Sequence, residues 1–430
     1  MSDSTNSGQS ERGLSRRKFF VLGGAGIAAA GLGTGALVVS GGRKSSDGTL
    51  ADERVPFFGE NQSGIVTPAQ DRLHFAAFDL VTTKRSDVVE LLRRWTEAAE
   101  QLTRGAAVGR YGAVDGLAAA PPDDTGEALD LPPSRLTITF GFGRSLFVDR
   151  EGNDRFGIGG RLPKGLIDLP HFPGDRLDPA RSNGDLCIQA CADDPQVAVH
   201  AVRNLARIAF GSATVRWSQL GFGRTSSTST SQITPRNLFG FKDGTANLKA
   251  ENAATINEHV WVQPADDQSW LANGTYLVAR RISMRIETWD RTSLGEQEAI
   301  FGRQKSSGAP LSGGDEFAGV DFAMMGRNDE PIVAQNAHVR LAHPTSNNGH
   351  AMLRRGYNFT DGTDGLGRLD AGLFFLAFVR DPVNQYVPLQ NRLAREDALS
   401  EYLQHTGSAL FVIPPGVSSA DAFIGVSLFA

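Results

Sequence analysis

Hydrophobic residues recur along the chain with two spacings, and the order in which these spacings alternate predicts the fold. Short runs in which apolar and polar residues alternate, or in which nearly every residue is apolar, are typical of β-strands. Longer segments with apolar residues three or four positions apart are typical of amphipathic helices. Strands are predicted at residues 72–80, 136–140, 186–191, 214–220, 274–282 and 372–379. Helices are predicted at residues 86–102, 194–210, 285–301 and 389–404, the third with a break at Gly295.

The predicted elements occur in a similar order twice. Each half of the chain gives β-α-β units joined by irregular segments, including a Pro/Asp-rich loop at residues 163–179. This order predicts an α+β fold made of two ferredoxin-like halves, with antiparallel sheets packed together. We place the two domains at residues 46–245 and 246–430. The preceding segment, residues 1–45, has the composition of a targeting sequence and is excluded from the fold.

The amino-terminal segment resembles a twin-arginine (Tat) export signal. It contains Ser15-Arg-Arg-Lys-Phe-Phe20, then an uncharged and mildly hydrophobic stretch at residues 21–40, then Arg43 and Lys44. A membrane anchor is the alternative, because about 20 apolar residues suffice to span a bilayer. The many glycines of the stretch favour the export signal. We therefore expect export by the Tat machinery to the periplasm, the cell wall or the extracellular space.

The composition argues against a nucleic-acid partner, a disulfide and cysteine-based metal sites. The net charge of -5 and the pI of about 5.9 give no reason to expect a nucleic-acid partner. Cys187 and Cys191 lie four residues apart on a predicted strand, about 13 Å, which is too far for a disulfide. We therefore expect two buried free thiols. Cysteine-based zinc or iron–sulfur sites lack ligands, and no Cys-x-x-Cys-His motif for covalent haem is present.

The first stretch with candidate chemistry covers residues 336–359, which hold three of the eight histidines and a pair of arginines. The five residues that begin at His338 alternate in polarity, which predicts a short extended strand. A polar turn follows Pro344 and reverses the chain. A histidine on one arm and Arg354 on the other can then point into one pocket. A metal ligand beside a fixed cation suits redox or oxygen chemistry.

His343 and His350 are the rivals of His338 within this stretch. On a strand, residues five positions apart face opposite sides, so His338 and His343 cannot both face one metal ion. His343 is also restricted by the proline that follows it, and His350 lies at the turn. His338 is therefore the predicted ligand, and a core histidine is the alternative for it.

A second motif, residues 238–247, follows the last predicted strand of the first half. Gly240 and Gly244 bracket Asp243 in a Gly-x-x-Asp-Gly pattern. Such a loop holds a carboxylate rigidly and lets a flat ligand approach the backbone closely. The alternative is a plain Asp-Gly turn, which is common in glycine-rich chains.

Together these motifs resemble the dye-decolorizing (DyP-type) haem peroxidases. The residues that carry the resemblance are Gly240-Phe-Lys-Asp-Gly244, His338-Val-Arg340, Leu353-Arg-Arg-Gly-Tyr-Asn-Phe359, Arg285-Ile-Glu-Thr-Trp289 and Leu373-Phe-Phe375. The resemblance covers essentially the whole chain after the signal. With the Tat signal, the chain is most similar to the exported bacterial A-type branch, which includes deferrochelatase/peroxidases. This implies a fold of the dimeric α+β barrel type, with the haem pocket mainly in the second half.

The resemblance also assigns roles. His338 would be the proximal ligand to the iron of a non-covalent haem b. Asp243 and Arg354 would form the distal pair, the carboxylate moving a proton of the peroxide and the guanidinium stabilising the developing charge. Arg355 and Arg285 would pair with haem propionates. Further expected haem contacts, for some of which ordinary core packing is the alternative, are Gly244, Phe359, Leu373 and Phe375.

The implied function is a peroxidase that uses hydrogen peroxide to oxidise organic donors, such as dyes and phenolics, through an oxidised haem. One alternative is a haem-binding protein or deferrochelatase that releases iron from haem. A non-catalytic binding module on the same scaffold, and chlorite chemistry on a related one, are further alternatives. The family resemblance also implies homo-oligomers. Large dyes require electron transfer through oxidisable side chains, and the sequence does not select among its tryptophans and tyrosines.

Overall fold

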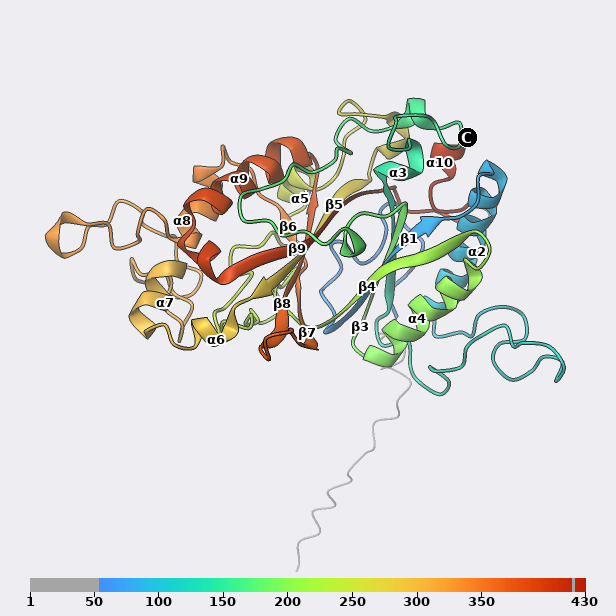
Figure 1. The fold of residues 1–430 in the computed structure, drawn as a ribbon, viewed down its shortest axis with the longest axis horizontal. Helices are drawn as coiled ribbons and strands as arrows, with labels where there is room; N and C mark the ends of the chain where they lie inside the picture. Colours follow the sequence, from blue (N-terminus) through green and yellow to red (C-terminus); the bar gives the residue numbers. More distant parts are fainter. Residues whose placement is uncertain (1–53, 420–421) are drawn as a thin grey trace, which may run out of the picture. The chain divides into compact units, whose positions relative to one another are not determined.

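One sheet takes strands from both halves of the chain (Figure 1). The computed structural model describes residues 54–419 and 422–430, so the predicted export signal lies outside the described residues. The strands of the described part are β1 (Arg72–Leu80), β2 (Thr137–Gly143), β3 (Leu186–Ala192), β4 (Ala213–Arg224), β5 (Thr275–Met284), β6 (Leu353–Arg354), β7 (Tyr357–Thr363), β8 (Leu369–Val379) and β9 (Leu403–Ile413). All six strands predicted from the sequence are present; the strand at 72–80 has the predicted bounds, and the other five have shifted ends.

The sheet closes on itself. Its order is β5-β9-β2-β3-β1-β4-β7-β8-β6, and an additional pairing joins β5 to β8. Eight strands therefore form a barrel. The short β6 pairs with the same edge of β8 as β7 does and lies in line with β7. Two four-stranded antiparallel sheets meet at two seams, β2–β9 and β4–β7, each of which has only two residue pairs. The predicted α+β fold of two ferredoxin-like halves in a barrel is confirmed.

Side chains of the strands alternate between the barrel interior and an outer layer under the helices. Inside lie buried residues of both halves, among them Phe75, whose ring contacts those of Phe374 and Phe411. Cys187 and Cys191 are buried there as free thiols, as predicted.

The helices cover the outside of the barrel. They are α2 (Arg85–Thr103), α3 (Arg144–Phe147), α4 (Pro195–Ile208), α5 (Ala253–His259), α6 (Ile286–Trp289), α7 (Leu294–Phe301), α8 (His338–Ala342), α9 (Val387–Glu396) and α10 (Val426–Phe429). Helices α2 and α4 lie on one side of the barrel and α6 to α9 on the other (Figure 1). Among the described residues, none of the helices combines the length and the apolarity needed to cross a membrane.

Capping explains two of the helix boundaries. Helix α4 begins as predicted, because Asp194 accepts hydrogen bonds from the backbone N–H groups of Gln196 and Val197. The predicted helix at 285–301 is two helices, α6 and α7, because Ser293 caps a new helix by accepting from Glu296 N–H. The break therefore precedes Gly295 instead of falling on it.

The prediction of a strand at residues 338–342 was wrong, because this segment forms α8. No strand of the described residues pairs with it, so an extended conformation would leave its backbone groups without partners. One helical turn satisfies them locally, with Arg340 and Leu341 N–H both bonded to Ala337 C=O. Five residues are too few to distinguish helical from strand periodicity. Likewise, the predicted helix at 389–404 ends at Glu396, and β9 follows after a 3₁₀ turn.

Candidate active site

The residues with candidate chemistry meet on the outer face of β8. Phe374 and Leu376 are fully buried inside the barrel, whereas Leu373 and Phe375, which alternate with them, face outward and are only half-buried. Strand β6 pairs Arg354 with Ala377, which puts the arginine on the same outer face. Leu373 packs against the aromatic cluster of α6 and α7. The alternation of β8 therefore separates a packed core from an apolar wall.

His338 begins α8, and a carboxylate fixes its orientation. Its Nδ1 lies 2.6 Å from Oδ2 of Asp397, whose side chain is 3% exposed. A carboxylate only accepts, so Nδ1 carries the proton. Its Nε2 makes no hydrogen bond with any residue of the described chain. The imidazole thus presents one free, oriented nitrogen. Sequence reasoning missed Asp397, which lies 59 residues away and belongs to no recognisable motif.

The charges around His338 decide its protonation. Burial lowers the pKa of His338, but the hydrogen bond and charge of Asp397, together with the charge of Asp243, raise it above its ordinary value. The charge of Arg354 acts in the opposite direction. Asp243 and Arg354 therefore lie close enough to His338 to shift its pKa, so the structure brings the three predicted residues into one site.

Asp243 and Arg354 form an ion pair, with Nη1 of the arginine 2.7 Å from Oδ1 of the carboxylate. The side chains are 15% and 27% exposed, so both keep access to an adjoining space. The second carboxylate oxygen lies 3.4 Å from the Asn237 amide nitrogen. Lys249 stands nearby: burial and the charge of Arg354 lower its pKa. The ion pair therefore combines a carboxyl group, Asp243, which can take up and release a proton, with a guanidinium, Arg354, which stays positively charged.

The Gly-x-x-Asp-Gly loop requires its glycines. Gly244 has φ +85°, and a Cβ there would lie 2.8 Å from Cα of Ser226. Gly240 has φ +81°. Lys242 and Thr245 both bond to Glu316, which fixes the outer side of the loop.

Asn247 joins this loop to the arginine. Its amide nitrogen donates to the carbonyl oxygen of Arg354, and its amide oxygen accepts from Arg354 N–H, both at 2.8 Å. The two motifs, more than a hundred residues apart in sequence, are therefore tied through main-chain hydrogen bonds. Asn247 is the last residue of the motif at 238–247, but the pattern alone does not indicate this role.

Two of the predicted haem contacts, Arg355 and Phe359, lie inside the barrel, and a third, Arg285, is not tested by the contacts. Arg355 alternates with Arg354 and points into the barrel, where it is fully buried and bonded to Thr67 C=O and the Gln70 amide oxygen. Nη1 and Nη2 thus donate inside the barrel, and Nε is buried there without a partner among the described residues, so the side chain does not face the outer site that the predicted propionate role requires. Phe359 is also fully buried there, with the Arg281 guanidinium 4.1 Å from its ring centroid, so it does not wall the outer site. Arg285 is exposed before α6, and its role stays a prediction.

The rival histidines are arranged differently from His338. The Nδ1 of His343 lies 2.8 Å from the Thr345 hydroxyl and accepts from Thr345 N–H, so this ring caps a short 3₁₀ turn. Burial and the charge of Arg303 lower its pKa. His350 follows the turn, after Asn348 and Gly349 in left-handed conformations. Helix α8 ends before His343, so the earlier argument from strand alternation does not apply, although its conclusion agrees with the observed contacts.

These residues fit haem better than a metal held by protein alone. Within the described residues, no group of three or more His, Cys, Asp or Glu side chains could hold a metal ion. His338 offers a single nitrogen, so an iron here needs further ligands from a macrocycle. The apolar wall of Leu373 and Phe375, and the stacked rings of Phe241 and Phe301 beside His338, suit a flat apolar group.

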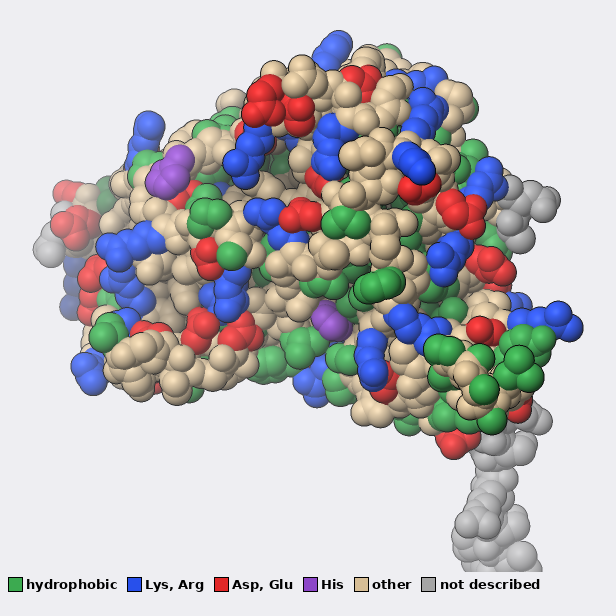
Figure 2. Space-filling view, turned by 45° about the vertical axis from the view of Figure 1, so that its right-hand side comes forward, with side chains coloured by type: hydrophobic (Ala, Val, Ile, Leu, Met, Phe, Trp, Pro, Cys, Tyr) green, Lys and Arg blue, Asp and Glu red, His purple; other side chains and the backbone are tan. Residues whose placement is uncertain are grey.

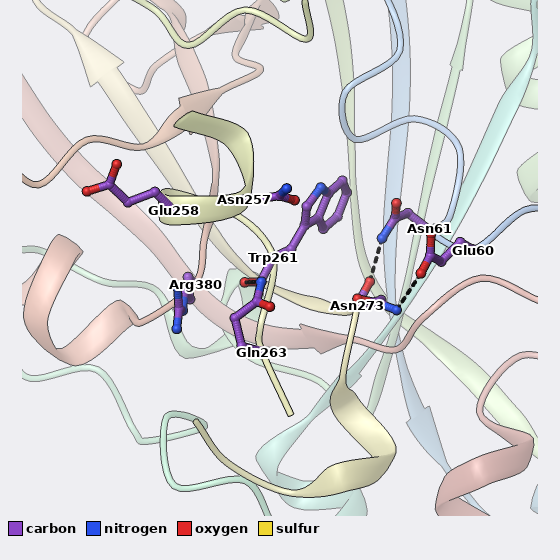
Figure 3. A pocket seen from close by; sticks show the side chains of 8 residues that line it. All are labelled: Glu60, Asn61, Asn257, Glu258, Trp261, Gln263, Asn273 and Arg380. Carbon is purple, nitrogen blue, oxygen red and sulfur yellow. Dashed lines mark hydrogen bonds between the residues drawn. The ribbon is translucent and has the colours of Figure 1, made fainter. Parts of the chain in front are cut away.

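Two other cavities lie away from this site. One, of about 640 Å³, is lined by polar side chains around Trp261 (Figure 3). Its polar groups are largely satisfied by protein: Asn61 donates to Asn273 C=O, Asn273 donates to Glu60, and Arg380 forms a two-point ion pair with Asp266. The other, of about 560 Å³, is mostly apolar and adjoins α2 and α4. Neither contains the residues of the first site.

Comparison with known proteins agrees with this geometry. A family model described as "Dyp-type peroxidase, N-terminal" matches residues 62–223, and one described as "Dyp-type peroxidase, C-terminal" matches residues 234–418. The chain belongs to the DyP-type peroxidase family. It is therefore a haem peroxidase, which acts on hydrogen peroxide and a reductant.

Individual relatives of this DyP-type peroxidase cover nearly its whole length. A protein named deferrochelatase from Yersinia pestis is 37% identical over 414 residues, which are 93% of this chain and 92% of the relative. The solved structure of DtpA from Streptomyces lividans is 40% identical, with a TM-score of 0.80, covering 89% of this chain and 99% of that one. A DyP-type peroxidase from Streptomyces coelicolor is 41% identical, with a TM-score of 0.78, covering 88% and 97%.

Proposed function

We propose that His338 binds the iron of a non-covalent haem b through Nε2. The observation that carries the proposal is the 2.6 Å contact between Nδ1 and Asp397, which orients the ring and leaves Nε2 free. A carboxylate partner of this kind raises the basicity of a ligating imidazole. Leu373 and Phe375 would contact the flat faces or edges of the macrocycle, and Gly244 would let the loop backbone approach it closely.

We propose further that Asp243 and Arg354 act on hydrogen peroxide. Bound haem would supply the redox-active iron, oxidised by peroxide and reduced again by an organic donor such as a phenol or a dye. Asp243 would take a proton from one peroxide oxygen and deliver it to the other as the O–O bond breaks. Arg354, 2.7 Å from that carboxylate, would stabilise the negative charge that develops on the leaving oxygen.

The test is the absorption spectrum of the purified protein before and after one equivalent of hydrogen peroxide. Wild type should show a Soret band that changes transiently and returns when a phenol is added. In His338→Ala the band should be lost or shifted. An unchanged Soret band in His338→Ala would place the ligand elsewhere, and a wild-type band indifferent to peroxide would contradict the peroxide chemistry.

Iron release from haem is the second candidate, because several relatives at about 37% identity are named deferrochelatase. The same pocket would serve it. Two parallel incubations of the haem-loaded protein separate the two activities: one with a reductant and a ferrous chelator but no peroxide, the other with peroxide and a dye. Iron transfer to the chelator with free porphyrin as product in the first supports release, whereas intact haem in the first and steady dye oxidation in the second support the peroxidase alone.

We also propose export through the Tat machinery, on the basis of Arg16 and Arg17 within the Ser-Arg-Arg-Lys-Phe-Phe sequence. Replacing both arginines by lysine should retain the protein in the cytoplasm, which fractionation measures. The family resemblance further supports a homo-oligomer, which light scattering of the purified protein tests.

A further inference from the structure

The mostly apolar cavity of about 560 Å³ lies outside the haem site and has no role in the function described above. It lies where the end of α2, the irregular segment at residues 105–136 and α4 come together. Most of its wall is aliphatic or proline: Leu102, Ala128, Leu131, Pro133, Leu136 and Val197. Its volume is in the range of pockets that hold one small organic molecule.

A histidine–aspartate pair forms the polar part of this cavity. His200 Nε2 lies 2.8 Å from Oδ1 of Asp124, and both side chains are almost completely buried. Asp124 also accepts from Val108 N–H and Gly126 N–H. Despite its burial, hydrogen bonds from His200 and these backbone groups lower the pKa of Asp124, so it is ionised.

This pair leaves an acceptor on the cavity wall. Because ionised Asp124 only accepts, Nε2 of His200 carries the proton of this hydrogen bond; in a neutral imidazole the lone pair is then on Nδ1. That Nδ1 makes no hydrogen bond with any residue in the described ranges and is not among the atoms sealed from solvent.

The cavity wall is preformed, because α4 holds the segment firmly. The contacts come from one stripe of the helix, at spacings of three or four residues, and reach residues 122–127. The α4 residues of this stripe are Gln196, His200, Arg203, Asn204 and Arg207. Ligand binding would therefore not have to order the segment first.

The charged side chains that line the cavity determine which kind of ligand it can bind. Asp124 and Asp130 line the cavity, and no lysine or arginine does. Its polar groups are therefore acceptors, and an anion would be repelled. We propose that this cavity binds a small, neutral aromatic molecule that carries a hydroxyl group, which donates its hydrogen bond to Nδ1 of His200.

The surface near the cavity agrees with an apolar ligand. Tyr111, Val114 and Leu117, on the same segment, are 48%, 73% and 80% exposed. Figure 2 shows hydrophobic side chains gathered at the lower right of the molecule, the region where Figure 1 places this segment. The haem site, under α8 and α9, lies at the other end of the view in Figure 1.

The test is calorimetric titration of the resting, haem-loaded protein with 2-methoxyphenol, with the Soret band followed in parallel. Because no peroxide is added, the result does not depend on the proposed catalysis. We expect a binding event that leaves the Soret band unchanged. Removing the hydroxyl donor, as in 1,2-dimethoxybenzene, should weaken this event about fivefold, the effect of one ordinary hydrogen bond. Benzenesulfonate should not compete.

Two variants and a matched control locate the event. Ala128→Phe fills the cavity and should weaken binding at least tenfold; Leu129→Trp, at a half-exposed lining residue, repeats the test if the first variant folds poorly. Ala119→Phe changes an exposed alanine of the same segment outside the cavity and should bind like wild type. Three outcomes would overturn the proposal. The first is unchanged affinity for 2-methoxyphenol in both filling variants, and the second is a Soret shift that always accompanies binding. The third is benzenesulfonate binding with an affinity equal to that of 2-methoxyphenol. The absence of any binding would overturn it as well.

Discussion

At the scale of single residues, the two carboxylates of the active site differ because their partners differ. Asp397 is almost fully buried; one carboxylate oxygen contacts the imidazole nitrogen of His338 and the other accepts from Leu399 N–H, so within the site its charge acts on His338. Asp243 keeps some exposure and contacts a guanidinium, so it can exchange protons with a small molecule that enters. The two substitutions to asparagine should therefore give separable effects.

Asp397→Asn keeps the shape of the side chain but removes its charge. We expect haem affinity to fall about 10–100-fold, the usual cost of losing the partner of a ligating histidine. The rate of haem transfer to an excess of an apoprotein acceptor measures this. Asp178→Asn, at the exposed cap of a 3₁₀ turn, is the control and should transfer haem at the wild-type rate. Equal rates of haem transfer for wild type and both variants would show that Asp397 does not contribute to haem binding.

Asp243→Asn should leave haem bound but slow the reaction with peroxide about 10²–10⁴-fold, because the proton carrier is lost. Stopped-flow measurement of the Soret change at several peroxide concentrations gives this rate. Asp364→Asn, in an exposed turn with its own arginine partner, changes the same charge elsewhere and should react normally. If the Asp243 variant reacted at the wild-type rate, a water molecule would have to move the proton instead, because Arg354 stays charged.

At the scale of elements, the sequence predicted what depends on periodicity and missed what depends on tertiary contacts. The strand at 72–80 and the cap of α4 at Asp194 were predictable, because alternation and capping are local. Helix α8 was not, because only the absence of a partner strand decides its conformation. The direction of Arg355 was predictable in principle, since neighbouring strand residues face opposite ways.

The link between the two motifs belongs to this scale as well. Asn247→Ala removes both hydrogen bonds to the main chain of Arg354 while keeping every proposed catalytic group. We expect a loss of about 1–3 kcal/mol in the free energy of unfolding, and a slower peroxide reaction because β6 and the loop lose their alignment. Denaturant unfolding and stopped-flow absorption measure the two effects. Asn257→Ala, at an exposed asparagine of α5, should change neither.

At the scale of the whole molecule, the barrel is held mainly within its two halves. Within each half, the backbone pairing of neighbouring strands extends over most of their length. The two seams between the halves, β2–β9 and β4–β7, have only two residue pairs each. The interior joins the halves: Phe75 of β1 contacts Phe374 of β8 and Phe411 of β9. Sequence periodicity indicated the two halves, but how they pair depends on these contacts between distant strands. Only the family motifs indicated that pairing in advance.

Two partly buried histidines, one on each half, should make the whole barrel sensitive to acid. Burial lowers the pKa of His74 on β1 to about 4, and burial with the charge of Arg280 lowers that of His405 on β9 to about 3. An unfolded histidine titrates near 6.5. As the pH falls from 6.5 towards 4, the unfolded chain therefore takes up protons that the folded chain refuses, and stability is lost.

The expected size of the effect makes it measurable. Between pH 7 and pH 5, His74 alone should reduce the free energy of unfolding by about 2 kcal/mol. In His74→Gln the decrease over this interval should be smaller by that amount, as measured by urea unfolding at the two pH values. His171→Gln, at an exposed histidine, should retain the wild-type decrease. If the free energy of unfolding fell equally in His74→Gln and wild type, the folded protein would accommodate a protonated His74, either through solvent access or through a rearrangement of β1.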